Sequence, residues 1–105
     1  DFLSMLEPRQ FDNGHIILKS LEEVSEFYLI SKGTAEVGYF NEASLADSAR
    51  NEPKHIFPIR YERGNSMAVF EIVFNIKSRF FYKAGDRGDK LSCFAIRRNN
   101  WKKLQ

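Results

Sequence analysis

The chain has 105 residues, 43% of them hydrophobic and 14% aromatic, which suffices for one folded core and excludes an intrinsically disordered segment. Its formal net charge of +2 indicates no general affinity for nucleic acid or an anionic membrane. With Cys93 as its single cysteine it forms no internal disulfide, which fits a reducing compartment. No apolar run reaches the ~18 residues of a membrane-spanning helix, and we expect neither a signal peptide nor direct membrane insertion of this segment. Because the chain starts at Asp1 rather than Met, we expect residues 1–105 to be a single domain of a larger protein.

Turn residues divide the first half of the chain into short apolar segments. Residues 1–6 carry four apolar side chains and predict a short amphipathic helix that ends before Pro8. Asp12-Asn13-Gly14 is a strong turn signal, because Asn and Gly tolerate positive φ. Short β-branched or alternating runs predict strands at residues 16–18, 27–30 and 34–40. The Lys32-Gly33 turn between the last two of these strands predicts a hairpin.

The second half has the same character after a polar stretch at residues 41–54, which we expect to be a long surface connection with at most a fragment of helix. Further strands are predicted at residues 56–61, 80–84 and 91–96. Pro58 marks the first of these as an edge strand, because proline cannot donate to a ladder. The apolar run 69–76 fits either a helix or a strand, and a final helix is expected from an Asn cap at 99 or 100. The sequence therefore predicts a mostly β fold with short flanking helices, an antiparallel β-roll or jelly-roll-like small barrel.

The order of these features resembles a known family. The residues that carry the resemblance are Gly14-His15-Ile16-Ile17, Glu22-Glu23, Phe27-Tyr28-Leu29-Ile30, Lys32-Gly33-Thr34-Ala35-Glu36-Val37 and the run from Phe94 to Leu104. In this order they are similar to the cyclic-nucleotide-binding domain of cation channels and cyclic-nucleotide-dependent kinases. The likeness covers nearly the whole chain, although the long helix that normally follows is missing.

The resemblance implies a ligand pocket in the middle of the chain. In ligand-binding members, Gly-Asp-x-aromatic-Gly-Glu opens a short helix, and an Arg follows nine residues after the Glu. Backbone N–H groups and the Arg hold the cyclic phosphate, and the Glu accepts from the ribose hydroxyl. Aligned on Gly64, this motif puts Ala68 at the second Gly, Val69 at the Glu and Ser78 at the Arg. The phosphate pocket is therefore expected to be degenerate.

Charged residues do occur close to the lost positions. Glu71 lies two residues after the Glu position and Arg79 one residue after the Arg position, and in a strand a shift of one residue turns a side chain to the opposite face. The candidate ligand-binding residues are Gly64, Met67, Ala68, Val69, Ser78, Arg79 and Phe80. The aromatic residues Phe70, Phe80 and Phe81 either fill the pocket space or belong to the core.

The leading hypothesis is a cytoplasmic regulatory domain of a cation channel, with weak or no cAMP or cGMP binding and no enzymatic activity. Its expected partners are the rest of the parent protein and other copies through that parent, and nucleic acid is not among them. A second hypothesis is a true sensor of a cyclic nucleotide or another small anion that uses Arg79. A third, a cupin-like barrel enzyme, needs a His-rich metal cluster. His15 and His55 are far apart and have no Cys or carboxylate at metal-ligand spacing, so no metal site and no catalytic residues are expected.

Overall fold

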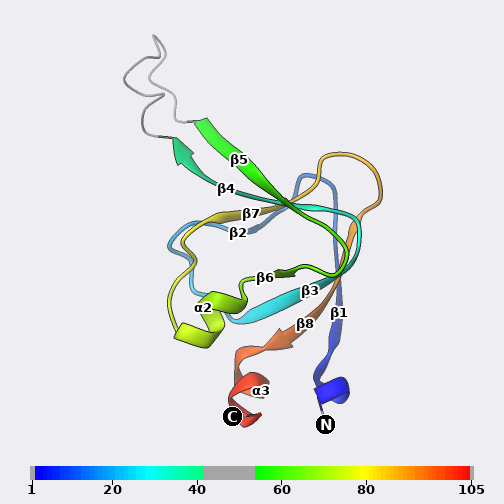
Figure 1. Cartoon of the computed structure of the whole chain (residues 1–105), viewed down its shortest axis with the longest axis vertical. Coiled ribbons are helices and arrows are strands. Elements are labelled where there is room, and N and C mark those ends of the chain that lie inside the picture. Colours follow the sequence, from blue (N-terminus) through cyan, green and yellow to red (C-terminus); the bar gives the residue numbers. More distant parts are fainter. Residues whose placement is uncertain (1, 42–53, 105) are drawn as a thin grey trace.

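The computed structural model describes residues 2–41 and 54–104 and arranges them as two antiparallel sheets of four strands each (Figure 1). The first sheet has the order β1 (Glu7–Phe11), β8 (Leu91–Arg97), β3 (Glu26–Lys32) and β6 (Ser66–Met67). The second sheet has the order β2 (Ile16–Leu18), β7 (Phe81–Ala84), β4 (Ala35–Asn41) and β5 (Lys54–Tyr61). The short helices are η1 (Phe2–Met5), α2 (Val69–Phe74) and α3 (Arg98–Lys103). The predicted mostly β roll with short flanking helices is confirmed.

The predicted hairpin of the strands on either side of Gly33 is wrong. β3 pairs with β8 and β6, whereas β4 pairs with β7 and β5, so the Gly33 turn carries the chain from one sheet to the other. Gly33 has φ +84°, and a Cβ there would come within 2.8 Å of the Lys90 carbonyl oxygen. Glycine is therefore needed at this crossing for both its conformation and its close approach to the backbone before β8.

Prolines mark strands at the edges of both sheets. Pro58 lies in β5, the edge strand of the second sheet, so the predicted edge position is confirmed. Pro8 lies inside β1, the edge strand of the first sheet, where it stands opposite Phe94. The sequence does not predict β1, because Pro8 indicates the end of the expected N-terminal helix. An edge strand tolerates proline, since one side of its backbone has no ladder partner.

The core lies between the sheets and is built mainly from residues of their strands, with Val24 and Ala68 from the segments between them. Its most deeply buried side chains include Val24, Ala35, Met67, Ala84, Leu91, Cys93, Ala95 and Ile96, each at most 2% exposed. Cys93 therefore has the expected buried position, and burial raises the pKa of its thiol to about 12. Trp101 of α3 packs against this core, edge to face with Phe27 at a centroid distance of 5.7 Å.

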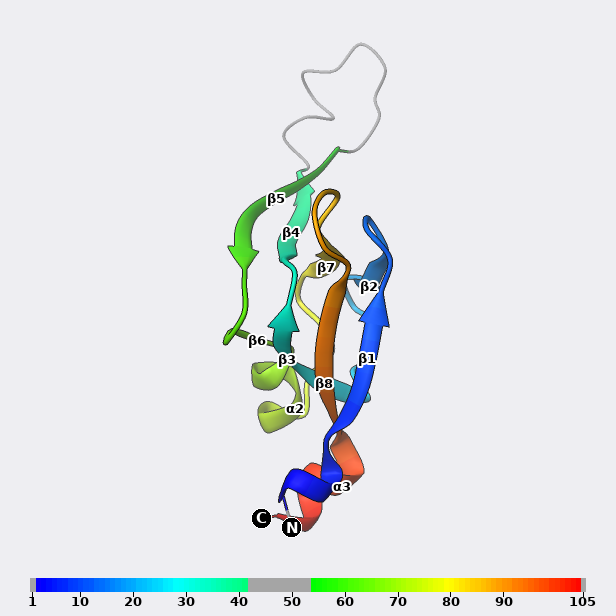
Figure 2. The same ribbon diagram turned by 90° about the vertical axis from the view of Figure 1, so that its right-hand side faces the viewer.

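The helices at the two ends of the chain lie beside each other at one end of the roll (Figures 1 and 2). η1 is a 3-10 turn without buried residues rather than an amphipathic helix. α3 begins at Arg98, directly after β8, with Arg97 rather than an Asn at the N-cap. Among the described residues no helix is long and apolar enough to cross a membrane. The predicted surface connection falls mainly on residues 42–53, which lie outside the described residues.

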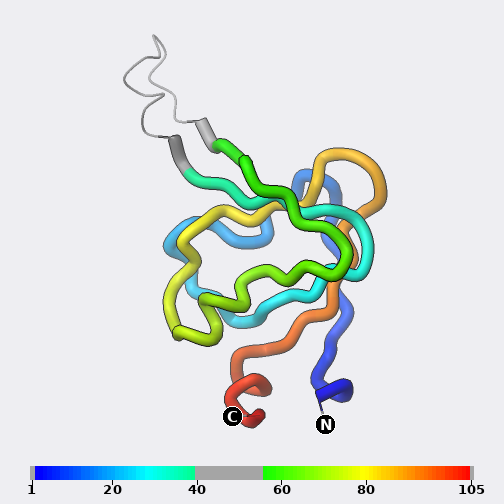
Figure 3. Tube along the Cα trace, viewed as in Figure 1, coloured from blue at the N-terminus to red at the C-terminus, as the bar shows by residue number. Residues whose placement is uncertain are grey.

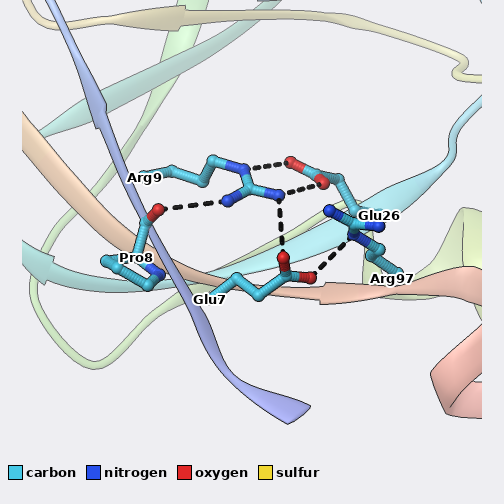
Figure 4. A network of polar contacts seen from close by, with 5 residues as sticks. All are labelled: Glu7, Pro8, Arg9, Glu26 and Arg97. Carbon is cyan, nitrogen blue, oxygen red and sulfur yellow. Dashed lines mark hydrogen bonds and ion pairs between the residues drawn. The ribbon is translucent and has the colours of Figure 1, made fainter.

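A network of charged side chains ties β1 to β3 across β8 (Figure 4). The Arg9 guanidinium donates to both carboxylate oxygens of Glu26, at 3.2 Å from Nε and 3.1 Å from Nη2. Glu7 pairs with Arg97 at 2.7 Å and lies 3.8 Å from Arg9. The hydrogen bond to Glu26 is the main cause of the raised pKa of Arg9. These charged groups therefore pair with one another, and they hold the edge strand β1 in register with its sheet.

Candidate functional site

The chain from β6 through α2 to β7 builds the candidate site. After β5 the chain turns back along β3 as β6, forms α2 and then returns to the second sheet as β7 (Figures 1 and 3). The turn before β6 is anchored on β3, because Gly64 donates to the Ile30 carbonyl at 3.0 Å and Ile30 donates to the Asn65 carbonyl at 2.9 Å. The site segment therefore starts from a fixed point of the first sheet.

Left-handed residues bound α2 on both sides. Ala68 has φ 65° and occupies the N-cap, and Asn75 has φ 54° and ends the helix by donating to the carbonyls of Glu71 and Ile72. The apolar run that fitted either a helix or a strand is thus a helix over Val69–Phe74. A left-handed conformation favours glycine, so the backbone at Ala68 is one in which the glycine that the sequence alignment predicts there would be unstrained.

A cavity of about 470 Å³ lies between α2 and the second sheet. Its deepest side chains belong to Val37, Ala68, Glu71 and Tyr82, each at most 5% exposed. The other lining residues are Ile59, Tyr61, Ser66, Val69, Phe70, Val73, Phe74, Arg79 and Phe80. The cavity is therefore largely apolar and aromatic, with few polar groups, as is usual for a small-molecule site.

The buried polar group of this cavity is the carboxylate of Glu71, a residue that is 2% exposed. The Tyr82 hydroxyl donates to Glu71 Oε2 at 2.8 Å. Burial, and then this hydrogen bond, raise the pKa of Tyr82, so its hydroxyl stays protonated and available as a donor. A buried carboxylate requires such partners. The pair thus presents a hydrogen-bond acceptor to anything that enters the cavity.

Arg79 lies at the exposed edge of the same cavity. Its guanidinium carbon is 4.7 Å from the Phe70 ring centroid and 5.4 Å from that of Phe80, so cation–π contacts hold it over the two rings. Among the described residues it makes no ion pair with an acid. Phe70 is 48% exposed, so it forms the rim rather than the core, whereas Phe80 packs against the core.

Ser78 is held inside the protein rather than in the cavity wall. It is completely buried, and its hydroxyl donates to the Phe80 carbonyl at 2.7 Å. Its backbone exchanges hydrogen bonds with the loop before β3, donating to Glu22 at 2.9 Å and accepting from Leu21 at 2.7 Å. The residue at the expected Arg position therefore has a structural role.

The structure brings some of the predicted site residues together. Ala68, Val69, Arg79 and Phe80 line the cavity. Met67 is 1% exposed in the core, Gly64 lies in the exposed turn and Ser78 is buried, so these three lie away from the lining. Ligand binding at all seven positions stays a prediction.

The candidate set missed Glu71, Tyr61 and Tyr82. Glu71 could have been found as the single acid in an apolar run, since a buried ionisable group marks functional sites more often than a surface one. The tyrosines had no such signal, because aromatic residues in strands are common core residues.

A second cavity, of about 430 Å³, lies near α3 and is lined by Arg9, Glu23, Val24, Ser25, Glu26, Arg97, Arg98 and Asn99. Several of its charges are already paired within the network of Figure 4, so the cavity beside α2 is the better candidate site.

Within residues 2–41 and 54–104 no group of three or more His, Cys, Asp or Glu side chains could hold a metal ion.

Comparisons of the sequence with family models and with curated proteins give no match. Solved structures do match. The catabolite activator protein of Thermus thermophilus superposes with a TM-score of 0.77 at 13% identity, over 97% of this chain and 42% of that protein. The regulatory subunit of a cAMP-independent protein kinase A from Trypanosoma cruzi, bound to guanosine, has a TM-score of 0.74 at 20% identity, over 97% of this chain and 32% of that one.

A mutant of the corresponding Trypanosoma brucei subunit, bound to cAMP, has a TM-score of 0.72 at 18% identity, over 94% of this chain and 32% of its own. This chain therefore spans less than half the length of each of these three proteins. The chain has the fold of the cyclic-nucleotide-binding domains.

Proposed function

We propose that this chain is a non-enzymatic regulatory domain whose cavity binds cAMP and cGMP weakly or not at all. The observation that carries the proposal is the Glu71 carboxylate, 2% exposed, in the lining of the cavity beside α2. A carboxylate repels a cyclic phosphate, by on the order of 4 kcal/mol at about 4 Å and an effective dielectric constant of about 20. An anion that enters this cavity meets that repulsion.

The residues at the two charged positions of the motif support the same proposal. Val69 has no group to accept from a ribose hydroxyl, and the Ser78 hydroxyl is already bonded to Phe80. Each charge-assisted bond that is missing costs about 1.5–3 kcal/mol of binding, so the loss of two weakens affinity by roughly two to four orders of magnitude.

The trypanosomal neighbours also favour a pocket without phosphate binding. The T. cruzi protein is the regulatory subunit of a cAMP-independent kinase and is bound to guanosine, a nucleoside that has no phosphate. The T. brucei mutant bound to cAMP carries three substitutions. Ala replaces a Glu, Arg replaces a Thr seven residues after that Glu, and Ala replaces the Val that follows the Thr. This chain has the same spacing of an acid and a hydroxyl residue, in Glu71 and Ser78.

The wider setting that we propose is a cytoplasmic domain of a larger protein, with a cation channel as parent. It rests on the resemblance of the sequence to the domains of such channels. In this setting the partners are the rest of the parent and further copies assembled through it. Six hydrophobic spans upstream in the full-length protein are the expected finding, and a kinase domain or a second copy of this fold there would contradict the channel parent.

The competing function is a sensor of a cyclic nucleotide or another small anion. The position of Arg79 at the rim of the cavity favours it, because the guanidinium is exposed and makes no ion pair among the described residues. Against it, the cation–π contacts hold Arg79 over Phe70 and Phe80, and Glu71 lies deeper in the same cavity.

Calorimetric titration of the chain with cAMP and with cGMP tests the proposal. We expect no binding tighter than about millimolar, because no buried cation lines the cavity among residues 2–41 and 54–104 for the phosphate to pair with. Micromolar binding of either nucleotide would overturn the proposal. If such binding is then lost in Arg79→Ala, the competing sensor function is correct.

A further inference from the structure

We infer that the cavity beside α2 binds an uncharged nucleoside, with the Glu71 carboxylate as the acceptor for hydroxyl groups of its ribose. This inference rests on the proposed function, because it assigns a ligand class to the same cavity. Glu71 is the residue that would make the cavity select a nucleoside over a cyclic nucleotide.

Within the described part of the chain, the capacity of Glu71 to accept hydrogen bonds is only partly used. A carboxylate has about four lone-pair positions, and the hydrogen bond from Tyr82 to Oε2 occupies one of them. The carboxylate lines the cavity although Glu71 is 2% exposed. Its remaining lone-pair positions can therefore accept hydrogen bonds from a ligand in the cavity. Neighbouring hydroxyls of a sugar can donate to both oxygens of one carboxylate, which a phosphate oxygen cannot do because it only accepts.

Charge makes the cavity selective. Glu71 is the charged group at its depth, whereas Arg79 is held at the rim by Phe70 and Phe80. A buried carboxylate without a cation beside it disfavours a second negative charge and favours neutral donors. A ligand that lacks the phosphate but keeps the sugar therefore fits this electrostatic environment.

The aromatic walls fit the other half of a nucleoside. Tyr61, Phe70, Phe74 and Phe80 all line the cavity, and the Phe70 and Phe74 rings lie 4.4 Å apart between centroids. Flat aromatic side chains stack with nucleobases in a manner that tolerates differences among bases. The volume of about 470 Å³ lies within the range of small-molecule sites.

Calorimetric titrations with adenosine, guanosine, adenine and cAMP test this assignment. We expect adenosine and guanosine to bind at least about 100-fold more tightly than cAMP, because only cAMP places a charge near Glu71. Adenine is expected to bind at least about tenfold more weakly than adenosine, since it lacks the hydroxyls. Glu71→Gln retains an acceptor for Tyr82 but loses the charge, and should weaken adenosine binding about tenfold or more.

Glu62→Gln is the matched control, because Glu62 is exposed and lies outside the cavity. The affinity of this variant for adenosine should equal that of the wild type. If adenosine, guanosine and cAMP all fail to bind, the nucleoside assignment is overturned while the proposed function stands. If cAMP binds in the micromolar range, the proposed function itself fails. Tight adenosine binding that Glu71→Gln leaves unchanged would remove Glu71 from the site. The comparison of wild-type affinities decides between ligand classes even if Glu71→Gln does not fold.

Discussion

Ala68, at the N-cap of α2, carries a backbone strain that a glycine would not have. The alignment of the sequence on Gly64 predicts a motif glycine at this position. The structure supplies the reason, since Ala68 has φ 65° at the start of α2. The importance of Glu71 was harder to predict, because its burial depends on where Tyr82 of the second sheet is placed.

We predict that Ala68→Gly changes the free energy of unfolding by less than about 1 kcal/mol. Relief of the left-handed strain, worth about 1–2 kcal/mol, offsets the lost methyl burial and the greater freedom of the unfolded chain. Ala84→Gly is the matched control, because Ala84 is fully buried in the regular strand β7. It should lose about 1–2 kcal/mol in chemical denaturation. Equal losses in the two variants would contradict the strain at Ala68.

At the scale of elements, turn residues and apolar patterns predicted where most strands lie, but they did not predict which strands pair. Turn residues correctly separated the strands β2, β3, β4, β5, β7 and β8. Pairing of β3 with β8 joins residues about 60 positions apart, such as Ile30 and Cys93, and no local pattern encodes that choice. β1 was missed for a related reason, since only its place at the edge of a sheet makes Pro8 acceptable there.

The Arg9–Glu26 contact between β1 and β3 should contribute measurably to stability. Its two hydrogen bonds are bidentate, and both side chains are at most 29% exposed. We predict that Glu26→Gln lowers the free energy of unfolding by about 1 kcal/mol, because a neutral amide cannot replace the paired carboxylate. Asp89→Asn is the control, since the Lys32–Asp89 pair is 4.0 Å apart and well exposed, and it should have no measurable effect in urea denaturation. Equal effects of the two substitutions would contradict a structural role for the network in Figure 4.

For the whole molecule, the fold can be predicted from the sequence more readily than the chemistry of the ligand. The overall fold of the roll is that of cyclic-nucleotide-binding domains. The fold was predictable because its signals are spread along the chain in a fixed order. The ligand is harder to predict, because the proposed binding depends on a few side chains such as Glu71 and Arg79, which line one cavity and lie outside the motif positions.

The most direct test of the proposed function is a calorimetric titration of cAMP into the wild type and into a Glu71→Ala variant. The variant removes the buried carboxylate from the lining of the cavity, so we predict that it binds cAMP at least about tenfold more tightly than the wild type does. Thermal unfolding of both proteins verifies that the variant is folded. Equal cAMP affinity in the wild type and in the folded variant would contradict the claim that Glu71 keeps the cyclic phosphate out.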